Sequence, residues 1–299
     1  MSKNKPQFPL YIPSKGRADS RYTAKALEEM GLFYTIVVEE QEYDEYAKVI
    51  DKKKILILDK KYQDEYDTCD DLGNSKSKGP GAARNFIWEH SISKGYKWHW
   101  VMDDNIKLFR RWNNNKRIKC YDGIPFKVME DFVLRYKNIA MAGPNYSFFV
   151  IDKWGYKYTP FTVNTRIYSC NLIRNDVPFR WRGRYNEDTD LSLQMLKAGW
   201  CTVQFNVFLQ EKTNTQVLKG GNTDAFYAKE GTIPKSKMQV QLHPDVSKLT
   251  WRYGRWHHYV NYNKFKRENR LILKDNVKLK DKVNNYGLKL KTIKNGKTS

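Results

Sequence analysis

The sequence contains little cysteine and little histidine, with 4 and 5 of these residues among 299. The cysteines are widely spaced, form no CxxC pair, and are Cys69, Cys120, Cys170 and Cys201. This scarcity argues against a zinc site and against a framework of disulfides, and it suits the reducing environment of a cytosol.

Long apolar runs are also missing. No run approaches the roughly 20 residues that a helix needs to cross a bilayer. Met1–Pro9 lacks the apolar core of a signal peptide. We therefore expect a soluble, cytoplasmic protein without a membrane partner.

Acidic residues are outnumbered, because 33 Asp and Glu against 54 Lys and Arg leave a formal net charge of +21. Solubility alone does not need so much positive charge, whose usual meaning is a polyanionic partner such as nucleic acid. The hydrophobic share of 40% and the aromatic share of 14% predict a real core and exclude global disorder.

Strands and helices alternate near the start of the chain. The segments Leu10–Pro13, Phe33–Val38 and Ile55–Leu58 are predicted strands, with helices between them at Ala18–Met30 and Glu42–Ile50. This order implies a parallel, right-handed α/β arrangement. Later segments continue it, with helices at Phe126–Lys137 and Thr189–Ala198, strands at Ile139–Gly143, Arg166–Ile173 and Trp200–Phe208, and a hairpin-like stretch at Tyr146–Tyr158.

A short apolar strand, Trp98–Met102, ends at Asp103, Asp104 and Asn105. Adjacent carboxylates beyond the carboxyl end of a strand repel one another unless a cation lies between them. Hard oxygen ligands favour Mg²⁺ or Mn²⁺, so the triplet predicts a divalent metal site. The same triplet also forms ordinary turns, so its context decides between the two.

Basic and aromatic side chains are interleaved in two places. A basic loop is expected after Asn105, and the second cluster precedes the predicted helix Thr189–Ala198. Such mixtures suit a phosphate backbone and exposed bases, although charge runs are usually solvated and each tryptophan can equally be core. The residues predicted to bind nucleic acid are Arg110, Arg111, Trp112, Lys116, Arg117, Arg180, Trp181, Arg182 and Arg184.

Two predicted helices begin with features that suit anions or charge. Gly79–Asn85 heads a helix that continues to His90, and glycines there let backbone amides approach phosphate, although ordinary capping explains them as well. The run lacks the spacing of a P-loop or of a dinucleotide-binding fingerprint. Glu187 and Asp188 directly precede the predicted helix Thr189–Ala198, where acidic side chains also complement the helix dipole.

The end of the chain is strongly basic. Between Arg255 and Ser299 there are 13 Lys or Arg and only 3 Asp or Glu. Aromatic residues accompany them, a composition that favours contact with nucleic acid. The length suits one large domain plus an appendage. We therefore assign residues 1–250 to an α/β domain and residues 251–299 to a basic extension.

Four motifs together resemble those of the TET-associated glycosyltransferases, a GT-A-like family found in DNA-modifying phages. They are Tyr11–Arg17, Gly79–Asn85, Met102–Asn105 and Asn186–Asp190. Their joint order is far more specific than any one of them, and the resemblance covers roughly residues 10–245. It implies a GT-A-like fold, a Rossmann-type mixed sheet flanked by helices.

The resemblance also implies roles for residues around a UDP-sugar donor. Asp103 would hold the metal and the donor ribose, and Glu39 would bond the uracil N3–H. The diphosphate would be neutralised by Arg17 and Arg84. The anion-binding loop before Arg17 adds the donor-binding residues Ser14 and Lys15.

The same resemblance implies the metal ligands and the catalytic base. Mn²⁺ or Mg²⁺ would be held by Asp103 and Asp104, with His243 as a C-terminal ligand, although a lone histidine is more often a packed residue. Asp188 is the first choice for the base that takes the acceptor's proton, and Glu187 the second.

The expected reaction moves arabinose or glucose from a UDP-sugar to the hydroxymethyl group of 5-hydroxymethylcytosine, or of a related pyrimidine, in DNA. The enzyme would act in the cytoplasm of an infected bacterial host. The acceptor base would be flipped out of the duplex, with Trp112, Trp181 or Tyr185 as stacking partners. Three alternatives remain: a GT-A enzyme acting on polysaccharide or protein, a non-catalytic DNA-binding protein with a degenerate fold, and a nuclease.

Overall fold

The computed structural model describes residues 4–72, 77–113, 116–150, 159–213 and 233–277. Its strands are β1 (Leu10–Pro13), β2 (Thr35–Val38), β3 (Ile55–Ile57), β4 (Trp98–Met102), β5 (Ile106–Asn113), β6 (Lys116–Lys119), β7 (Ile139–Tyr146), β8 (Phe161–Val163), β9 (Cys170–Arg174), β10 (Cys201–Lys212), β11 (Ser247–Arg252) and β12 (Arg255–Val260). In these ranges ten strands form one mixed sheet, ordered β3-β2-β1-β4-β9-β7-β10-β5-β6, with β8 paired to β10.

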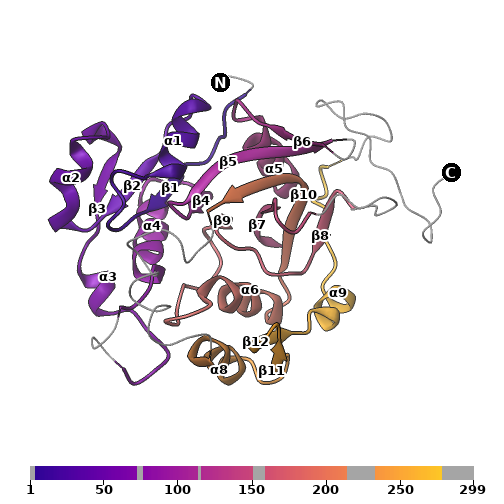
Figure 1. Ribbon diagram of the computed structural model, residues 1–299. Coiled ribbons are helices and arrows are strands. Elements are labelled where there is room, and N and C mark those ends of the chain that lie inside the picture. Colours follow the sequence, from indigo (N-terminus) through magenta and orange to yellow (C-terminus); the bar gives the residue numbers. More distant parts are fainter. Residues whose placement is uncertain (1–3, 73–76, 114–115, 151–158, 214–232, 278–299) are drawn as a thin grey trace.

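Helices cover both faces of the sheet (Figure 1). They are α1 (Tyr22–Glu29), α2 (Tyr43–Ala47), α3 (Lys61–Asp64), α4 (Gly81–Ser93), α5 (Ile124–Val133), α6 (Glu187–Lys197), α8 (Ile233–Leu242) and α9 (Asn263–Glu268). Leu27 of α1 and Phe126 of α5 belong to one buried cluster, while Trp88 of α4 and Leu191 of α6 belong to another. The predicted α/β fold, a mixed sheet flanked by helices, is confirmed.

The parallel half of the sheet comes from the start of the chain. β1 pairs in parallel with β2 and with β4, and β2 pairs in parallel with β3. The first helix begins at Tyr22 rather than at Ala18, because Arg21 has a positive φ of 21° and its N–H bonds to the Arg17 carbonyl in a turn. Parallel strands end at one edge of a sheet, which is where ligands usually bind.

The other half is mostly antiparallel and corrects one prediction. The expected basic loop after Asn105 is instead the antiparallel pair β5–β6. Ile106 and Phe109 are buried while Arg111 is exposed, so β5 is buried at its start and becomes exposed toward its end. β10 continues beyond the predicted end at Phe208, because this part pairs with β5.

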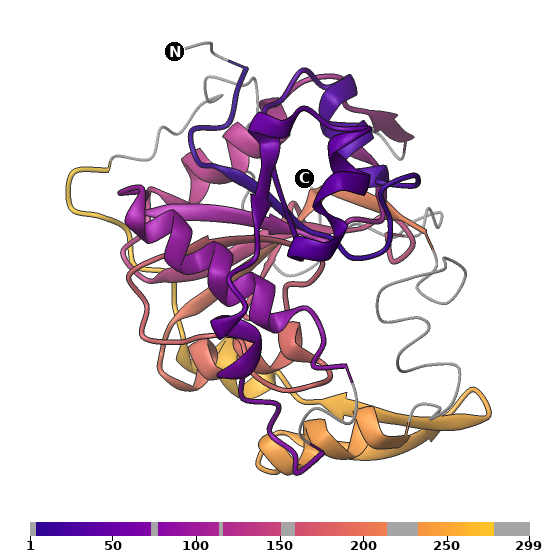
Figure 2. The ribbon, with the colours of Figure 1, turned by 90° about the vertical axis from the view of Figure 1, so that its left-hand side faces the viewer.

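The described part of the C-terminal extension packs against the rest of the chain. Residue 250, the predicted boundary, falls within β11, which forms a hairpin with β12. In α9, Phe265 is 2% exposed and packs against Leu193 and Leu196 of α6. Figure 2 shows α8 and the hairpin together at one end of the molecule. Residues 278–299 lie outside the described ranges.

Three other predictions concern single features of the chain. No helix in the described ranges is long and apolar enough to cross a membrane. The four cysteines are free thiols. The predicted hairpin at Tyr146–Tyr158 lies largely outside the described residues, since 151–158 are not among them.

Candidate active site

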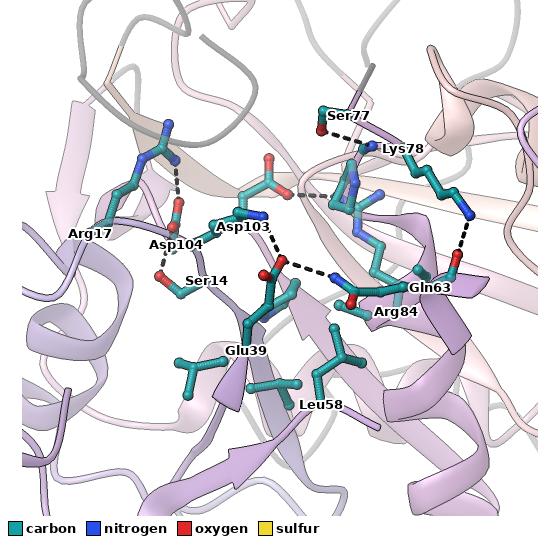
Figure 3. Close-up of a pocket in the computed structure, with 18 of the residues that line it drawn as sticks. Ser14, Arg17, Glu39, Leu58, Gln63, Ser77, Lys78, Arg84, Asp103 and Asp104 are labelled. Atoms are coloured by element: carbon teal, nitrogen blue, oxygen red, sulfur yellow. Dashed lines mark hydrogen bonds and ion pairs between the residues drawn. The ribbon is translucent and has the colours of Figure 1, made fainter. Parts of the chain in front are cut away.

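A cavity of about 710 Å³, the first cavity, opens at the carboxyl edge of the parallel strands (Figure 3). Its wall includes residues that directly follow β1, β2, β3 and β4, namely Ser14, Glu39, Leu58 and Asp103. The N-terminus of α4 also borders it, where Gly79 has a φ of 78° that glycine adopts without strain. Segments far apart in the sequence therefore converge on one polar cavity.

Glu39 lies in this cavity as an ionised acceptor. Its Oε1 accepts from Lys15 Nζ at 2.6 Å and from Gln63 Nε2 at 2.9 Å. Burial alone would raise the pKa of Glu39, but Lys15 and the neighbouring amides bring it below its usual value. Sequence analysis did not identify Gln63, because this residue belongs to a helix of one turn. It also did not identify Lys78, which donates to the Gln63 carbonyl, because this lysine precedes the glycine run without a motif of its own.

Asp104 borders the first cavity and bonds to the loop that follows β1. Its Oδ1 accepts from Arg17 Nη1 at 2.5 Å, and its Oδ2 accepts from Ser14 Oγ at 2.8 Å. Tyr46 of α2 contacts the same Ser14 hydroxyl at 2.7 Å. Burial raises the pKa of Asp104 above its usual value, although Arg17 and Ser14 oppose that change. The predicted loop Ser14–Arg17 and Asp104 thus form one unit.

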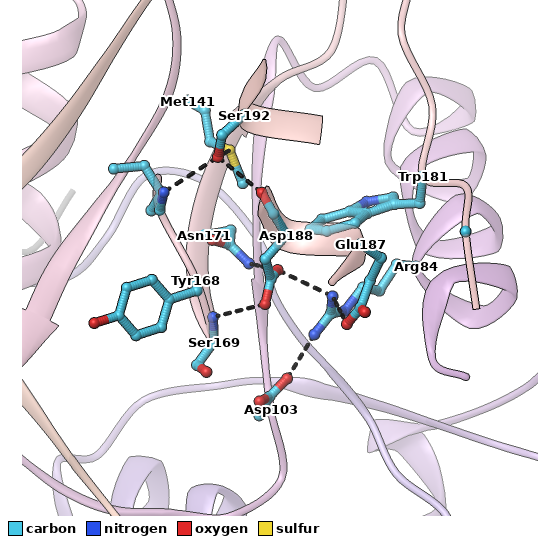
Figure 4. A network of polar contacts seen from close by, with 12 residues as sticks. Arg84, Asp103, Met141, Tyr168, Ser169, Asn171, Trp181, Glu187, Asp188 and Ser192 are labelled. Atoms are coloured by element: carbon cyan, nitrogen blue, oxygen red, sulfur yellow. Dashed lines mark hydrogen bonds and ion pairs between the residues drawn. The ribbon is translucent and has the colours of Figure 1, made fainter. Parts of the chain in front are cut away.

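Arg84 is the centre of a second polar network (Figure 4). Its Nη2 lies 2.6 Å from Asp103, and its Nη1 lies 3.0 Å from both Glu187 and Asp188. The guanidinium also lies 4.5 Å from the ring centroid of Trp181, an arrangement typical of cation–π contact. Three predicted site carboxylates, from the end of β4 and the start of α6, therefore meet at one buried arginine.

Lys212 also reaches Asp103 and was missed in the sequence. It is the last residue of β10, and its Nζ lies 2.5 Å from Asp103 Oδ2 and 2.9 Å from Ser169 Oγ. Burial would raise the pKa of Asp103, but Lys212 and Arg84 hold it well below its usual range. The predicted strand ended at Phe208, four residues before Lys212, so the sequence did not indicate that this lysine lies at the site.

Asp188 lies in the first turn of α6 and is held from several sides. Its Oδ1 accepts from Arg84 and from Asn171 Nδ2 at 3.2 Å, while its Oδ2 accepts from the Ser169 N–H at 3.4 Å. Burial raises the pKa of Asp188 to about 7, because it outweighs the opposing effect of Arg84 and is reinforced by Glu187. A carboxylate with a pKa near neutrality is suited to general base catalysis.

A second cavity of about 850 Å³ adjoins the first. Both cavities are bordered by Asp103, Glu187 and Lys212. In the second, Tyr146 and Tyr168 are stacked with ring centroids 4.8 Å apart. Its basic and imidazole side chains are Arg117, Arg166, Arg184, Lys212, Lys235, Arg255 and His258. The second cavity is thus richer in aromatic rings than the first, and Asp188 faces it.

The first predicted nucleic-acid cluster lies on β5 and β6, and comprises Arg110, Arg111, Trp112, Lys116 and Arg117. Arg117 borders the second cavity. Arg111 and Lys116 are exposed, while Arg110 Nε is ion-paired with Glu211 at 2.6 Å. Trp112 is half-buried, with the Arg117 guanidinium 5.9 Å from its ring centroid. This strand pair brings positive charge to the rim of the second cavity.

The arginines of the second predicted nucleic-acid cluster form ion pairs with carboxylates of the protein itself. Arg180 pairs with Glu89, Arg182 with Asp190, and Arg184 with Asp70. Trp181 and Arg184 are each 1% exposed, which corrects the expectation that Trp181 stacks on DNA. Trp181 instead supports Arg84, and Tyr185, at 7% exposed, borders the second cavity.

The donors as arranged do not fit a divalent metal ion. His243 is 2% exposed, donates through Nε2 to Asp190 Oδ1 at 2.8 Å and borders neither cavity, which corrects its expected place beside Asp103. The oxygens of Asp103 and Asp104 all accept from protein donors. In the described ranges no group of three or more His, Cys, Asp or Glu side chains could hold a metal. The Mn²⁺ or Mg²⁺ site stays a prediction.

A family model described as TET-Associated Glycosyltransferase matches residues 8–221 of the chain. No curated protein matches the chain in sequence. The matched range runs from β1 through β10 and so includes Arg84, Asp103, Glu187, Asp188 and Lys212. The match extends over more than half of the sequence. The chain therefore belongs to the TET-associated glycosyltransferase family, and it is a glycosyltransferase.

Proposed function

We propose that this enzyme transfers arabinose or glucose from a UDP-sugar to the hydroxymethyl group of 5-hydroxymethylcytosine, or of a related hydroxymethylated pyrimidine, in DNA. The observation that carries the proposal is that the two cavities meet at Asp103, Glu187 and Lys212. The first is polar and borders a helix N-terminus, as a diphosphate requires, and the second is aromatic and basic, as a DNA base requires. A sugar at their shared wall is within reach of both substrates.

The first cavity suits the nucleotide part of the donor. The N-terminus of α4 offers unpaired backbone N–H groups and a favourable dipole to the diphosphate. Arg17 and Lys78 add positive charge on either side. At the far end, Glu39 provides an ionised acceptor for the uracil N3–H, and the apolar side chain of Leu58 lies beside it against the base.

The second cavity suits an acceptor base that has left the DNA stack. A hydroxymethyl group on a stacked base is hard to reach inside a duplex, so extrusion of the nucleotide is required. Tyr146 and Tyr168 supply stacking surfaces beside Asp188, the proposed base. These two tyrosines replace Trp181 as the proposed partners of the flipped base, because Trp181 is buried against Arg84.

The proposed chemistry is a direct displacement at the anomeric carbon. Asp188 accepts the proton of the acceptor hydroxyl as its oxygen bonds to the sugar, and the UDP departs into the first cavity. Attack from the second cavity, on the side opposite the departing UDP, inverts the anomeric centre. Asn171 and the Ser169 N–H orient the Asp188 carboxylate for this transfer.

Exposed basic and aromatic side chains near the second cavity support DNA as the acceptor. Arg255 and His258 of β12 border the cavity, and the same hairpin carries Trp251 and Tyr253, which are 60% and 91% exposed. Such a surface fits a phosphate backbone and bases. A neutral polysaccharide would not need it, and a purely electrostatic DNA-binding protein would gain nothing from the carboxylates around Arg84.

The test is a transfer assay on DNA that contains 5-hydroxymethylcytosine, with a panel of UDP-sugars and nucleoside mass spectrometry. We expect the modified nucleoside to gain the mass of one pentose or one hexose. The matched control is the same DNA with unmodified cytosine, which lacks the acceptor oxygen and should gain nothing. If no modified base gains mass while the enzyme still binds UDP, the proposed acceptor is wrong.

A further inference from the structure

Asp103 is enclosed by positive charge that the protein itself supplies. Its Oδ1 lies 2.6 Å from Arg84 Nη2, and its Oδ2 lies 2.5 Å from Lys212 Nζ. The two cationic side chains are only 2% and 6% exposed. Within the described residues, both oxygens that a metal ion would need at this position are therefore already bonded to a buried cation.

A divalent ion at Asp103 would have to displace one of these cations or lie beside both. Like charges repel strongly in a buried site, because little solvent screens them. Lys212 forms an ion pair with Asp103, so an anionic partner within the site compensates its buried charge. The wall of the first cavity also includes six Lys or Arg against five Asp or Glu, an excess of positive charge before any ligand binds.

We propose that Lys212, together with Arg84, supplies the positive charge that a divalent ion commonly supplies to a leaving diphosphate, so that this enzyme transfers sugar without a metal. The inference rests on the UDP-sugar donor of the proposed function. Lys212 borders both cavities, so its ammonium group lies at the wall where the sugar passes from one substrate to the other. Ser169 fixes that group from the side of the second cavity, at 2.9 Å.

The charge that needs compensation appears in one step. The acceptor oxygen forms a bond to the anomeric carbon, and the bond from that carbon to the β-phosphate oxygen breaks. The hydroxyl proton passes to Asp188, and the electron pair of the broken bond stays on the phosphate oxygen, which adds one negative charge to the diphosphate. An ammonium group has three N–H donors, so Lys212 can give up a neutral partner such as Ser169 and donate to this oxygen while Asp103 still anchors it.

The experiment measures UDP binding by calorimetry and sugar transfer by nucleoside mass spectrometry, each with excess EDTA and with added Mn²⁺ or Mg²⁺. We expect both to be the same in EDTA as with metal for the unaltered enzyme. Lys212→Met keeps much of the volume and removes the charge, so it should lower transfer by about 10²–10³-fold. It should weaken UDP binding in EDTA by about tenfold.

Two further variants separate charge from folding. Lys212→Arg keeps the charge and should retain measurable transfer in EDTA, even if Lys212→Met lowers the melting temperature. Lys53→Met removes an exposed lysine before β3, at the opposite edge of the sheet, and should change neither quantity. Loss of UDP binding and transfer in EDTA, with recovery on adding Mn²⁺ or Mg²⁺, would overturn the inference.

The binding measurement needs no DNA, so the inference and the proposed acceptor fail in different ways. Metal-independent UDP binding that weakens in Lys212→Met would support the inference even if no DNA base were modified. Equal UDP affinity in Lys212→Met and in the unaltered enzyme would count against it, even if DNA were glycosylated.

Discussion

The two cavities that meet at Asp103, Glu187 and Lys212 are built in different ways. In the first, charged groups are bonded to one another, as in Arg17 with Asp104, because residues that follow parallel strands converge at one edge of the sheet. The second is bordered by the antiparallel half, α8 and the hairpin, and it includes Phe148, which is 79% exposed. The first cavity therefore offers preorganised charge, which suits the proposed nucleotide-sugar, whereas the second offers an open aromatic surface, which suits the proposed DNA base.

The largest expected effect lies at the wall between the cavities. Asp188→Asn removes the proposed base and should lower the rate of transfer by about 10²–10⁴-fold, while UDP affinity stays nearly unchanged. Initial rates and calorimetry on the same preparation measure the two quantities. Glu187→Gln is the matched control, because Glu187 lies at the same 3.0 Å from Arg84. An equal loss of rate in Glu187→Gln would contradict the assignment of the base to Asp188.

The next effect concerns stability rather than rate. Arg84→Met leaves Asp103, Glu187 and Asp188 without their shared counter-charge in a buried site. We expect the free energy of unfolding to fall by about 3–5 kcal/mol, measured by urea denaturation. Arg84→Lys should cost less, since it keeps one positive charge. A fall as small as that of an exposed substitution would show that the carboxylates do not depend on Arg84.

A smaller effect should separate the cavities from each other. Tyr168→Ala removes one of the two stacked rings of the second cavity and should weaken DNA binding by about 1–3 kcal/mol, with UDP affinity unchanged. Glu39→Gln should do the reverse, raising KM for the UDP-sugar and leaving KM for DNA unchanged. If Tyr168→Ala weakened UDP binding as well, the division of the site into two independent halves would be wrong.

The smallest expected effect is the dependence of rate on pH. The pKa of Asp188 is raised to about 7, and a general base acts only when it is deprotonated. We therefore expect kcat/KM to rise about tenfold between pH 6 and pH 8 and to level off above that range. Rates measured across this range in one buffer series test it. In Asp188→Asn the residual rate should lose this rise, and a rise that persisted there would assign it to another group.

Local patterns predicted the strand ends that border the first cavity, and the family resemblance implied roles for the residues there. Ser14, Glu39, Asp103 and Asp104 each come at or just after the end of an apolar strand, and parallel strands present such positions at a common edge. The helix at Gly79–Asn85 was predicted from its glycines and lies at the same edge. The positions of these strand ends and of the helix follow from information within a few residues of each, whereas the binding roles of the residues there stay predictions.

The second cavity did not follow from local patterns. The basic residues beside Trp181 in the sequence predicted an exposed aromatic side chain, yet Trp181 is buried against Arg84. Tyr168 had no predicted role, yet it borders the second cavity. His243 resembled a metal ligand by its position in the chain, but the packing of α8 pairs it with Asp190. Burial and partner choice depend on which helices and strands come together, which no single stretch of sequence contains.

Short-range periodicity and residue type are properties of the sequence alone. They set which segments form helices or strands, the parallel start of the sheet and which site residues are acidic, basic or aromatic. Which charge meets which carboxylate is set by long-range pairing. Lys212 reaches Asp103 across 109 positions of sequence because β10 pairs with β5 and brings Lys212 opposite Ile106, three residues after Asp103. A shift of one residue in that pairing would turn the lysine to the other face of the sheet and remove its charge from the site.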